Sequence, residues 1–266
     1  MYTEITYDLG DTLDHGYHHA GMHGAKGEKR APRTKPTPEQ VIYQNRMNKA
    51  ANIRRLVKAN FTTADWFVTL TYREGCRKKM KGVKGDLRDF LSAMRTAYKK
   101  RGQQLKFIYC IEIGSRGGIH IHIIMNDTDK FNRLLQLFWT HGHPNMKNLY
   151  EEGDFRKLSE YMAGFPKTKD GEKAGFTPLD SERYAYNRSR NLYVSQPVRK
   201  KYSHWTMRAV MGKDGIPKPT PGYYIDRESI RQGVNRFTGL SYLYYSEHRI
   251  NTLYGRHYTD TGGGGG

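Results

Sequence analysis

The sequence predicts an α+β fold in which helices pack against a central antiparallel β-sheet, and two observations support this prediction. Three segments between residues 66 and 125 are rich in β-branched and aromatic residues, and two of them flank a short glycine-containing loop, as in an antiparallel hairpin. Other segments between residues 38 and 165 carry apolar residues at helical spacing. Helices combined with an antiparallel sheet are typical of the α+β class.

A capping box marks the start of the first predicted helix. Thr37 is the N-cap, Pro38 takes the first helical position, and Gln40 stands three residues after the cap. This helix runs to about residue 60. The elements that follow are a strand at Trp66–Tyr72, a helix at 84–101, strands at Lys106–Ile113 and Ile119–Met125, a helix at about 128–140, and a helix from an Asp154 cap to about Phe165.

The flanking parts of the chain lack a clear hydrophobic period. Residues 1–37 contain glycine, histidine, proline and scattered charge, so we expect a flexible N-terminal arm. Metal binding by the four histidines between residues 15 and 23 is the less favoured interpretation, because no cysteine or acidic partner stands at ligand spacing. Residues 38–200 are predicted to form the main domain, and residues 201–266 a basic, tyrosine-rich C-terminal region with a flexible glycine tail.

Charge indicates the class of partner. The chain has 45 Lys and Arg against 26 Asp and Glu, which gives a formal net charge of +19. A surplus this large favours a polyanionic partner, because each phosphate that is neutralised releases condensed counterions. A ribosomal-type or merely soluble basic protein is the alternative that charge alone leaves open. No hydrophobic helix or lipidation signal favours a membrane partner.

Cysteine usage and the N-terminus favour an intracellular protein. The two cysteines, Cys76 and Cys110, show no Cys-x-x-Cys metal spacing, and Cys110 stands in an apolar run typical of a buried, reduced thiol. The first residues include an acid and no basic stretch before an apolar core, so we expect no secretory signal and a cytoplasmic location.

Two histidines and one glutamate are predicted to share one face of the sheet. Residues of the same parity in a strand point to the same side, so His120 and His122 project together. If Gly114 pairs with Gly118 across the hairpin loop, Glu112 lies opposite His120 and diagonal to His122. A slip of one residue would move Glu112 to the other face, so the prediction depends on this register.

Two imidazoles and a carboxylate on one face can hold a divalent cation and leave positions open for substrate oxygens. The alternative is a set of partly exposed polar residues on a half-solvated sheet. We predict a metal site at Glu112, His120 and His122. Mg²⁺ or Mn²⁺ suits a DNA-processing role better than Zn²⁺, although nitrogen-rich ligation also allows Zn²⁺.

These motifs carry a resemblance to a known family. His120-Ile121-His122 resembles the histidine–hydrophobe–histidine signature of HUH endonucleases, and Thr69-Leu70-Thr71-Tyr72 is similar to their first motif. The block from Asn60-Phe61 to Tyr72, with the later Arg188-Ser189-Arg190-Asn191-Leu192, resembles bacterial and phage rolling-circle replication-associated proteins in particular. The resemblance covers about residues 40–200. It implies an RRM-like, ferredoxin-like core and an enzyme that acts on replication-origin DNA of a phage or plasmid in a bacterial host.

The resemblance also implies a tyrosine nucleophile on a helix after the metal strands. Its hydroxyl attacks a phosphodiester and leaves a 5′-phosphotyrosine link and a free 3′-hydroxyl. Tyr161 matches best, because it lies at the edge of an apolar helical stripe, roughly 80° from the centre of that stripe. Lys157, one turn earlier, is the candidate for contacting the phosphate or stabilising the tyrosinate. Many relatives have a lysine three or four residues after the tyrosine, where this chain has Gly164 and Phe165; Tyr184 and Tyr186 are reserve nucleophiles.

DNA contacts are predicted on two basic regions. The first helix has a cationic side, and a later region interleaves cations with tyrosines, as in single-strand binding sites. The residues assigned to DNA binding are Arg46, Arg54, Arg55, Lys58, Arg183, Arg188 and Arg190. A solvated helix face and tyrosines that pack a small subdomain are the structural alternatives.

Partners and alternative functions follow from the same motifs. No Gly-x-x-x-x-Gly-Lys-Ser/Thr loop occurs, so a host or separate helicase would unwind the duplex and a polymerase would extend the primer. A relaxase or transposase of the same superfamily would share the chemistry. A non-catalytic, basic nucleic-acid-binding protein with structural histidines is the alternative from a different class.

Overall fold

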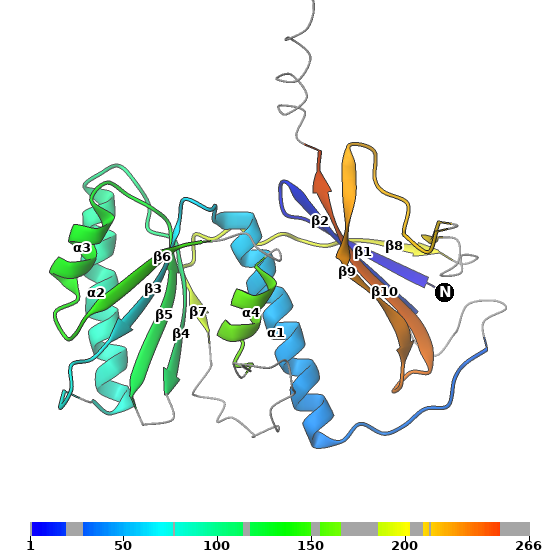
Figure 1. The fold of residues 1–266 in the computed structure, drawn as a ribbon, viewed down its shortest axis with the longest axis horizontal. Coiled ribbons are helices and arrows are strands. Elements are labelled where there is room, and N and C mark those ends of the chain that lie inside the picture. Colours follow the sequence, from blue (N-terminus) through cyan, green and yellow to red (C-terminus); the bar gives the residue numbers. More distant parts are fainter. Residues whose placement is uncertain are drawn as a thin grey trace, which may run out of the picture. The chain divides into compact units, whose positions relative to one another are not determined.

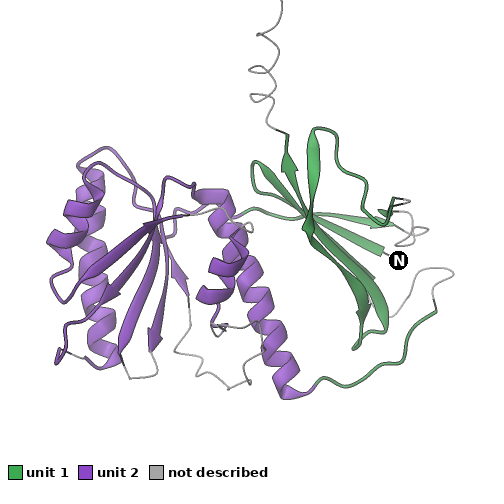
Figure 2. Ribbon diagram, in the orientation of Figure 1, with its two compact units in different colours: residues 1–36, 195–266 green, residues 37–194 purple. Residues whose placement is uncertain are grey.

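The computed structural model divides the chain into two compact units (Figure 1, Figure 2). Unit 2 comprises residues 37–194, and unit 1 combines residues 1–36 with residues 195–266. The residues whose structure is described are 2–19, 29–76, 78–113, 118–149, 155–165, 186–202, 210–212 and 214–250. Each unit is described by itself.

Unit 2 is built on a five-stranded antiparallel sheet with the strand order β6-β3-β5-β4-β7. Its elements are α1 (Pro38–Asn60), β3 (Trp66–Thr71), α2 (Met80–Lys99), β4 (Phe107–Ile113), β5 (Ile119–Met125), α3 (Phe131–Phe138), β6 (Pro144–Asn148), α4 (Arg156–Met162) and β7 (Asn187–Arg188). An antiparallel sheet with packed helices confirms the predicted α+β class. The three predicted strands are present as β3, β4 and β5, and the four predicted helices as α1 to α4.

Helices cover both faces of this sheet, with α2 and α3 on one side and α1 and α4 on the other (Figure 1). Ile121 and Ile123 pack with residues of α2 and α3. Ile108 and Ile124 pack with residues of α1 and α4. Our expectation of helices on one face only, with the histidines on an uncovered face, is therefore wrong. The histidine face is apolar at its far end, and that end needs a cover to leave water.

The helix boundaries follow from their caps. Gln40 N donates to Thr37 Oγ1 at 3.4 Å and Thr37 N donates to Gln40 Oε1 at 3.0 Å, so the predicted capping box is confirmed. The N-cap of α4 is Phe155, whose φ of 56° is left-handed. Asp154, which we predicted as that cap, lies outside the described residues.

Unit 1 contains a second five-stranded antiparallel sheet, with the order β8-β1-β2-β10-β9. Its strands are β1 (Tyr2–Asp8), β2 (Thr12–His19), β8 (Val198–Tyr202), β9 (Tyr223–Asn235) and β10 (Leu240–Arg249). The flexible arm expected over residues 1–37 is thus wrong for β1 and β2, which are both paired strands. In the same way, much of the C-terminal region expected to be irregular forms β8, β9 and β10.

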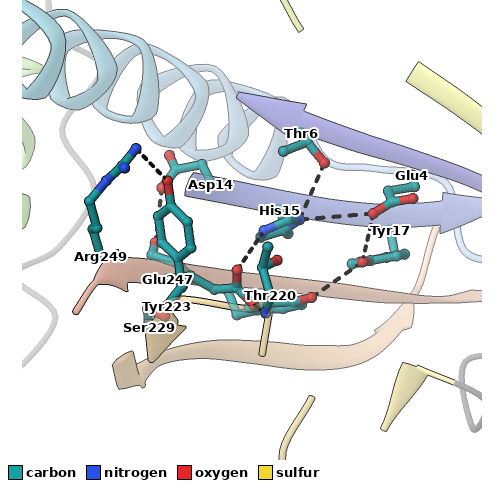
Figure 3. A network of polar contacts seen from close by, with 12 residues as sticks. Glu4, Thr6, Asp14, His15, Tyr17, Thr220, Tyr223, Ser229, Glu247 and Arg249 are labelled. Carbon is teal, nitrogen blue, oxygen red and sulfur yellow. Dashed lines mark hydrogen bonds and ion pairs between the residues drawn. The ribbon is translucent and has the colours of Figure 1, made fainter. Parts of the chain in front are cut away.

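Polar groups fill much of the unit 1 interior, which explains why its strands lack a hydrophobic period (Figure 3). His15 Nε2 lies 3.3 Å from Oε2 of Glu247, a residue with no exposed surface. Tyr17 donates a hydrogen bond of 2.9 Å to Glu4 Oε1, and its hydroxyl lies 3.2 Å from that of Tyr245. Since buried polar groups are stable when paired, histidine, tyrosine and glutamate occupy positions that aliphatic residues take in most strands.

Among the described helices, none is long and apolar enough to cross a membrane.

Candidate active site

Strand pairing brings the predicted metal-binding residues onto one face. In the β4–β5 hairpin Glu112 pairs with His120 and Cys110 pairs with His122, which confirms the predicted register. On the other side of β5, Thr69 of β3 pairs with His122. The hydrophobic residues between the two histidines point into the α2–α3 core, so a one-residue slip would expose them.

Three side chains meet at the polar end of this face. His122 Nε2 lies 2.9 Å from Glu112 Oε2. The Tyr161 hydroxyl donates to Glu112 Oε2 at 2.5 Å and lies 2.6 Å from His122 Nε2. Tyr161 thus joins two residues that precede it by 49 and 39 positions. We call Glu112, His122 and Tyr161 the triad.

His122 is fixed from its other side. It is 5% exposed, and its Nδ1 lies 3.2 Å from Thr69 Oγ1. The ring of Phe67 stacks on the imidazole with 5.7 Å between centroids and 2° between planes. With Thr69 as hydrogen-bond acceptor, the proton stays on Nδ1 and the lone pair of Nε2 faces the triad. The sequence prediction missed these roles of Thr69 and Phe67, although the parity argument applied to β3 would have found both.

His120 lies beside the triad rather than within it. Its ring is parallel to that of His122, with 6.2 Å between the centroids. Across the part of the chain that the structure describes, no group of three or more His, Cys, Asp or Glu side chains is gathered as a complete metal centre. The donor chemistry nevertheless fits a divalent cation: Glu112 Oε2 and His122 Nε2 already converge, and His120 is the paired neighbour of Glu112.

Helix α4 positions Tyr161 through its apolar side. Phe155 and Met162 are buried in the core that α4 shares with α1, and Tyr161 packs partly against the same core. The ring of Tyr161 meets the His122 ring edge-on, with 4.9 Å between centroids. The edge of the helical stripe therefore faces the sheet, as the spacing predicts. Lys157 is exposed on α4 and takes no part in the hydrogen bonds that join the triad.

Cys110 and Lys49 line the apolar part of the same face. Burial raises the pKa of the Cys110 thiol to about 12, so the thiol stays protonated and unreactive, as expected. Burial also lowers the pKa of Lys49, which the nearby Cys110 partly offsets. Lys49 Nζ lies 5.9 Å from the ring centre of Tyr186, one of the reserve nucleophiles. Tyr186 packs against the α1–α4 core, and Tyr184, the other reserve, lies outside the described residues.

The residues predicted to bind DNA fall into two groups. Those on α1 are half-buried: Arg46, Arg54, Arg55 and Lys58. Lys58 Nζ lies 5.9 Å from the ring centre of Phe155, so this cation packs on the α1–α4 core. Arg188 on β7 and Arg190 just after it are exposed, and Arg183 lies outside the described residues.

The segment around Arg188 is tied to the edge of the sheet. Phe107 N donates to Ser189 Oγ at 3.1 Å, and Ser189 N donates to the Phe107 carbonyl at 2.9 Å. Asn60 and Tyr193 exchange two hydrogen bonds of 2.8 and 2.7 Å. These contacts explain why two motifs far apart in the sequence belong to one unit, with the exposed arginines held at the sheet edge.

Comparison with known protein families supports a role in DNA replication. Residues 65–166 match the model of a family described as replication-associated protein of the ORF2 type. The matched part runs from the residue before β3 to just beyond α4, so it contains the triad and His120. Comparisons with curated proteins and with solved structures gave no match. The match supports a replication initiator protein.

Proposed function

We propose that this chain initiates rolling-circle replication by nicking and rejoining single-stranded origin DNA through a 5′-phosphotyrosine intermediate. The observation that carries the proposal is the meeting of the Tyr161 hydroxyl with Glu112 Oε2 and His122 Nε2. A tyrosine held only by core packing has no need of a histidine and a carboxylate at its hydroxyl. The family match over residues 65–166 supports the replication role.

Glu112, His120 and His122 would hold the divalent cation, with Mg²⁺ or Mn²⁺ as the expected metals. When bound, such an ion polarises the scissile phosphate and offsets the negative charge that develops on its oxygens. Thr69 supports this donor set by holding the His122 ring with Nε2 toward the triad.

Tyr161 would act as the nucleophile. Its oxygen forms a bond to phosphorus while the bond from phosphorus to the 3′ oxygen breaks, and that 3′ oxygen takes up a proton. The phenolic proton leaves toward Glu112, which accepts the hydroxyl hydrogen bond in this structure. A free phenol has a pKa near 10 and attacks slowly at neutral pH, so holding the hydroxyl in place supplies part of the rate. Reversal by a 3′-hydroxyl rejoins the strand without an external energy source.

The exposed Arg188 and Arg190 would contact the DNA backbone at the sheet edge, and the cations of α1 would add positive potential. Lys157, one turn before Tyr161, would contact the phosphate once DNA is bound. A separate helicase and a polymerase would complete replication, because the sequence holds no nucleotide-binding loop of the Walker type.

The test uses purified full-length protein and single-stranded oligonucleotides tiled across its own replicon. We expect cleavage with Mn²⁺, none with EDTA, and a covalent adduct on the 5′ end of one product. Tyr161→Phe should abolish the adduct, while Tyr186→Phe, a tyrosine of the same unit, should retain it. His120→Ala with His122→Ala should abolish Mn²⁺ binding in a calorimetric titration.

Three results would contradict the proposal. Full nicking by Tyr161→Phe would move the nucleophile to another tyrosine. An unchanged Mn²⁺ titration of the double histidine variant would remove the metal assignment. Cleavage of none of the strands by the wild-type protein would favour a non-catalytic nucleic-acid-binding protein.

A further inference from the structure

One face of the unit 1 sheet combines exposed tyrosine rings with cations in the same cross-strand rows. One row, running across β8, β1, β2, β10 and β9, consists of Arg199, Ile5, Gly16, Tyr244 and Arg231. The next row consists of Lys201, Thr3, His18, Tyr242 and Gly233. Tyr244 is 44% exposed, and the three cations are all exposed. Neither row contains an acid.

The two tyrosine rings lie over glycines of the neighbouring strands. A Cβ added at Gly16 would lie 2.9 Å from Cε1 of Tyr244, and one added at Gly233 would lie 3.2 Å from the hydroxyl oxygen of Tyr242. Each ring therefore occupies the space above a strand where a side chain would otherwise stand. The ring centroids are 5.7 Å apart. The backbone supports one face of each ring, which leaves the other face available to a partner.

A third tyrosine extends the same face. Tyr224 is 54% exposed and pairs with His248, with 5.5 Å between the two rings. His248, Tyr244 and Tyr242 alternate along β10, so they share one side of the sheet. We call Tyr224, Tyr242 and Tyr244, with Arg199, Lys201 and Arg231, the tyrosine face.

The opposite face of the sheet already provides the core of unit 1. Tyr2, Tyr17, Leu243 and Tyr245 are buried there in one cluster. The hydroxyl of Tyr17 donates to Glu4, and this contact belongs to the buried polar network (Figure 3). The tyrosines that stabilise the sheet are thus buried and hydrogen-bonded to carboxylates, whereas Tyr224 and Tyr244 on the tyrosine face present large exposed rings beside cations.

Charge and ring chemistry together select the partner. Cations beside exposed rings attract a polyanion, and unpaired bases offer flat surfaces for stacking. Burial first, and then the neighbouring His19 and Arg199, lower the pKa of His18, so this ring in the Tyr242 row is neutral at neutral pH. Bases in a duplex already stack on one another, so the rings give little to duplex DNA.

We propose that the tyrosine face binds single-stranded DNA, with Tyr224, Tyr242 and Tyr244 stacking on bases and Arg199, Lys201 and Arg231 contacting phosphates. It rests on the proposed function only in taking DNA as the strand. The face would hold a stretch of the unwound strand that is not itself being cut, since its residues belong to unit 1 and the triad belongs to unit 2.

The test measures binding of a fluorescently labelled oligothymidine to the full chain by anisotropy, with EDTA present to prevent cleavage. Each stacked ring that is lost should weaken binding about 5-fold or more, so Tyr242→Leu with Tyr244→Leu should weaken it about 25-fold or more. The matching phenylalanine pair keeps both rings and should bind as the wild type does. Tyr43→Leu, which alters a half-exposed tyrosine of unit 2, should also leave affinity unchanged.

The cations are tested through salt dependence. Arg199→Ala with Arg231→Ala should lower the slope of log affinity against log salt by about 1.4, since each phosphate contact to a single strand contributes about 0.7. Wild-type protein should bind the single strand more tightly than the duplex of equal length.

The proposal is overturned if the leucine pair, with native circular dichroism, binds oligothymidine as the wild type does. It is equally overturned if the phenylalanine pair loses as much affinity as the leucine pair. Tyr161→Phe separates this inference from the proposed function, because it should bind oligothymidine normally while it fails to nick origin DNA. Binding that depends on the tyrosine face in a wild-type protein without nicking activity would leave the inference standing alone.

Discussion

Replacing Thr69 with valine removes the hydroxyl beside His122 Nδ1 and keeps the shape of the side chain. The Thr69 Oγ1 to His122 Nδ1 distance is 3.2 Å, and His122 is 5% exposed, so water does not readily replace the lost partner. Leaving a buried polar group unpaired costs about 1–3 kcal/mol. If this cost falls on the metal-binding orientation of the ring, Mn²⁺ affinity and nicking rate should fall between about 5-fold and about 150-fold.

Two variants serve as controls for Thr69→Val. Thr69→Ser keeps the hydroxyl and should retain most of the Mn²⁺ affinity. Thr71→Val lies on the same strand and the same face, but the Thr71 hydroxyl donates to the His143 carbonyl at 2.9 Å rather than to a histidine ring. It should lose stability without a comparable loss of Mn²⁺ affinity. Calorimetric titration measures the metal, and the imidazole nitrogen signals in NMR report the tautomer of His122. Equal Mn²⁺ affinity in Thr69→Val and wild type would refute the reasoning.

Two further predictions concern stability. Ile121 has no exposed surface, so Ile121→Ala should lower the free energy of unfolding by about 2–5 kcal/mol, whereas Leu137→Ala, at a residue 61% exposed, should change it by less than about 0.5 kcal/mol in denaturant titration. Burial by itself raises the pKa of Glu247, but its contacts with His15 and Thr220 outweigh burial and hold the pKa below its ordinary value of 4.5. Its contribution to stability is therefore present above pH 4.5 and lost as the pH falls through the lowered value, and Glu247→Gln should flatten this acid limb of the unfolding curve. An acid limb of unchanged steepness in the variant would show that other carboxylates cause it.

The sequence predicts unit 2 well because its signals are local. The capping box at Thr37 uses residues three apart, and the hairpin that pairs Glu112 with His120 is closed by a short loop. Helical stripes and strand parity then follow from the period of each element. The placement of helices on both sheet faces was not predicted, because the parity argument considered the histidines and left out Ile108 and Ile124 at the apolar end of the same face.

Unit 1 was missed because its signals are neither local nor apolar. Strand β2 pairs with β10, more than 200 residues later, and no turn links the two. The buried positions hold His15, Tyr17 and Glu247, which satisfy one another through hydrogen bonds and an ion pair instead of forming a hydrophobic stripe. A pattern of tyrosine, histidine and acid at alternating positions is therefore indistinguishable from a polar arm until the partner strands are known.

The sequence alone determined which residues can share a face: period-two geometry sets Glu112, His120 and His122 together once the hairpin register is given. It also determined that Tyr161 lies at the edge of an apolar helical stripe. Only the tertiary structure decided that this edge meets the histidine face, because the packing of α4 against α1 and the sheet sets the distance of the Tyr161 hydroxyl from Glu112 and His122. Periodicity fixes directions within one element, whereas side chains from separate elements meet only through the packing of the whole core.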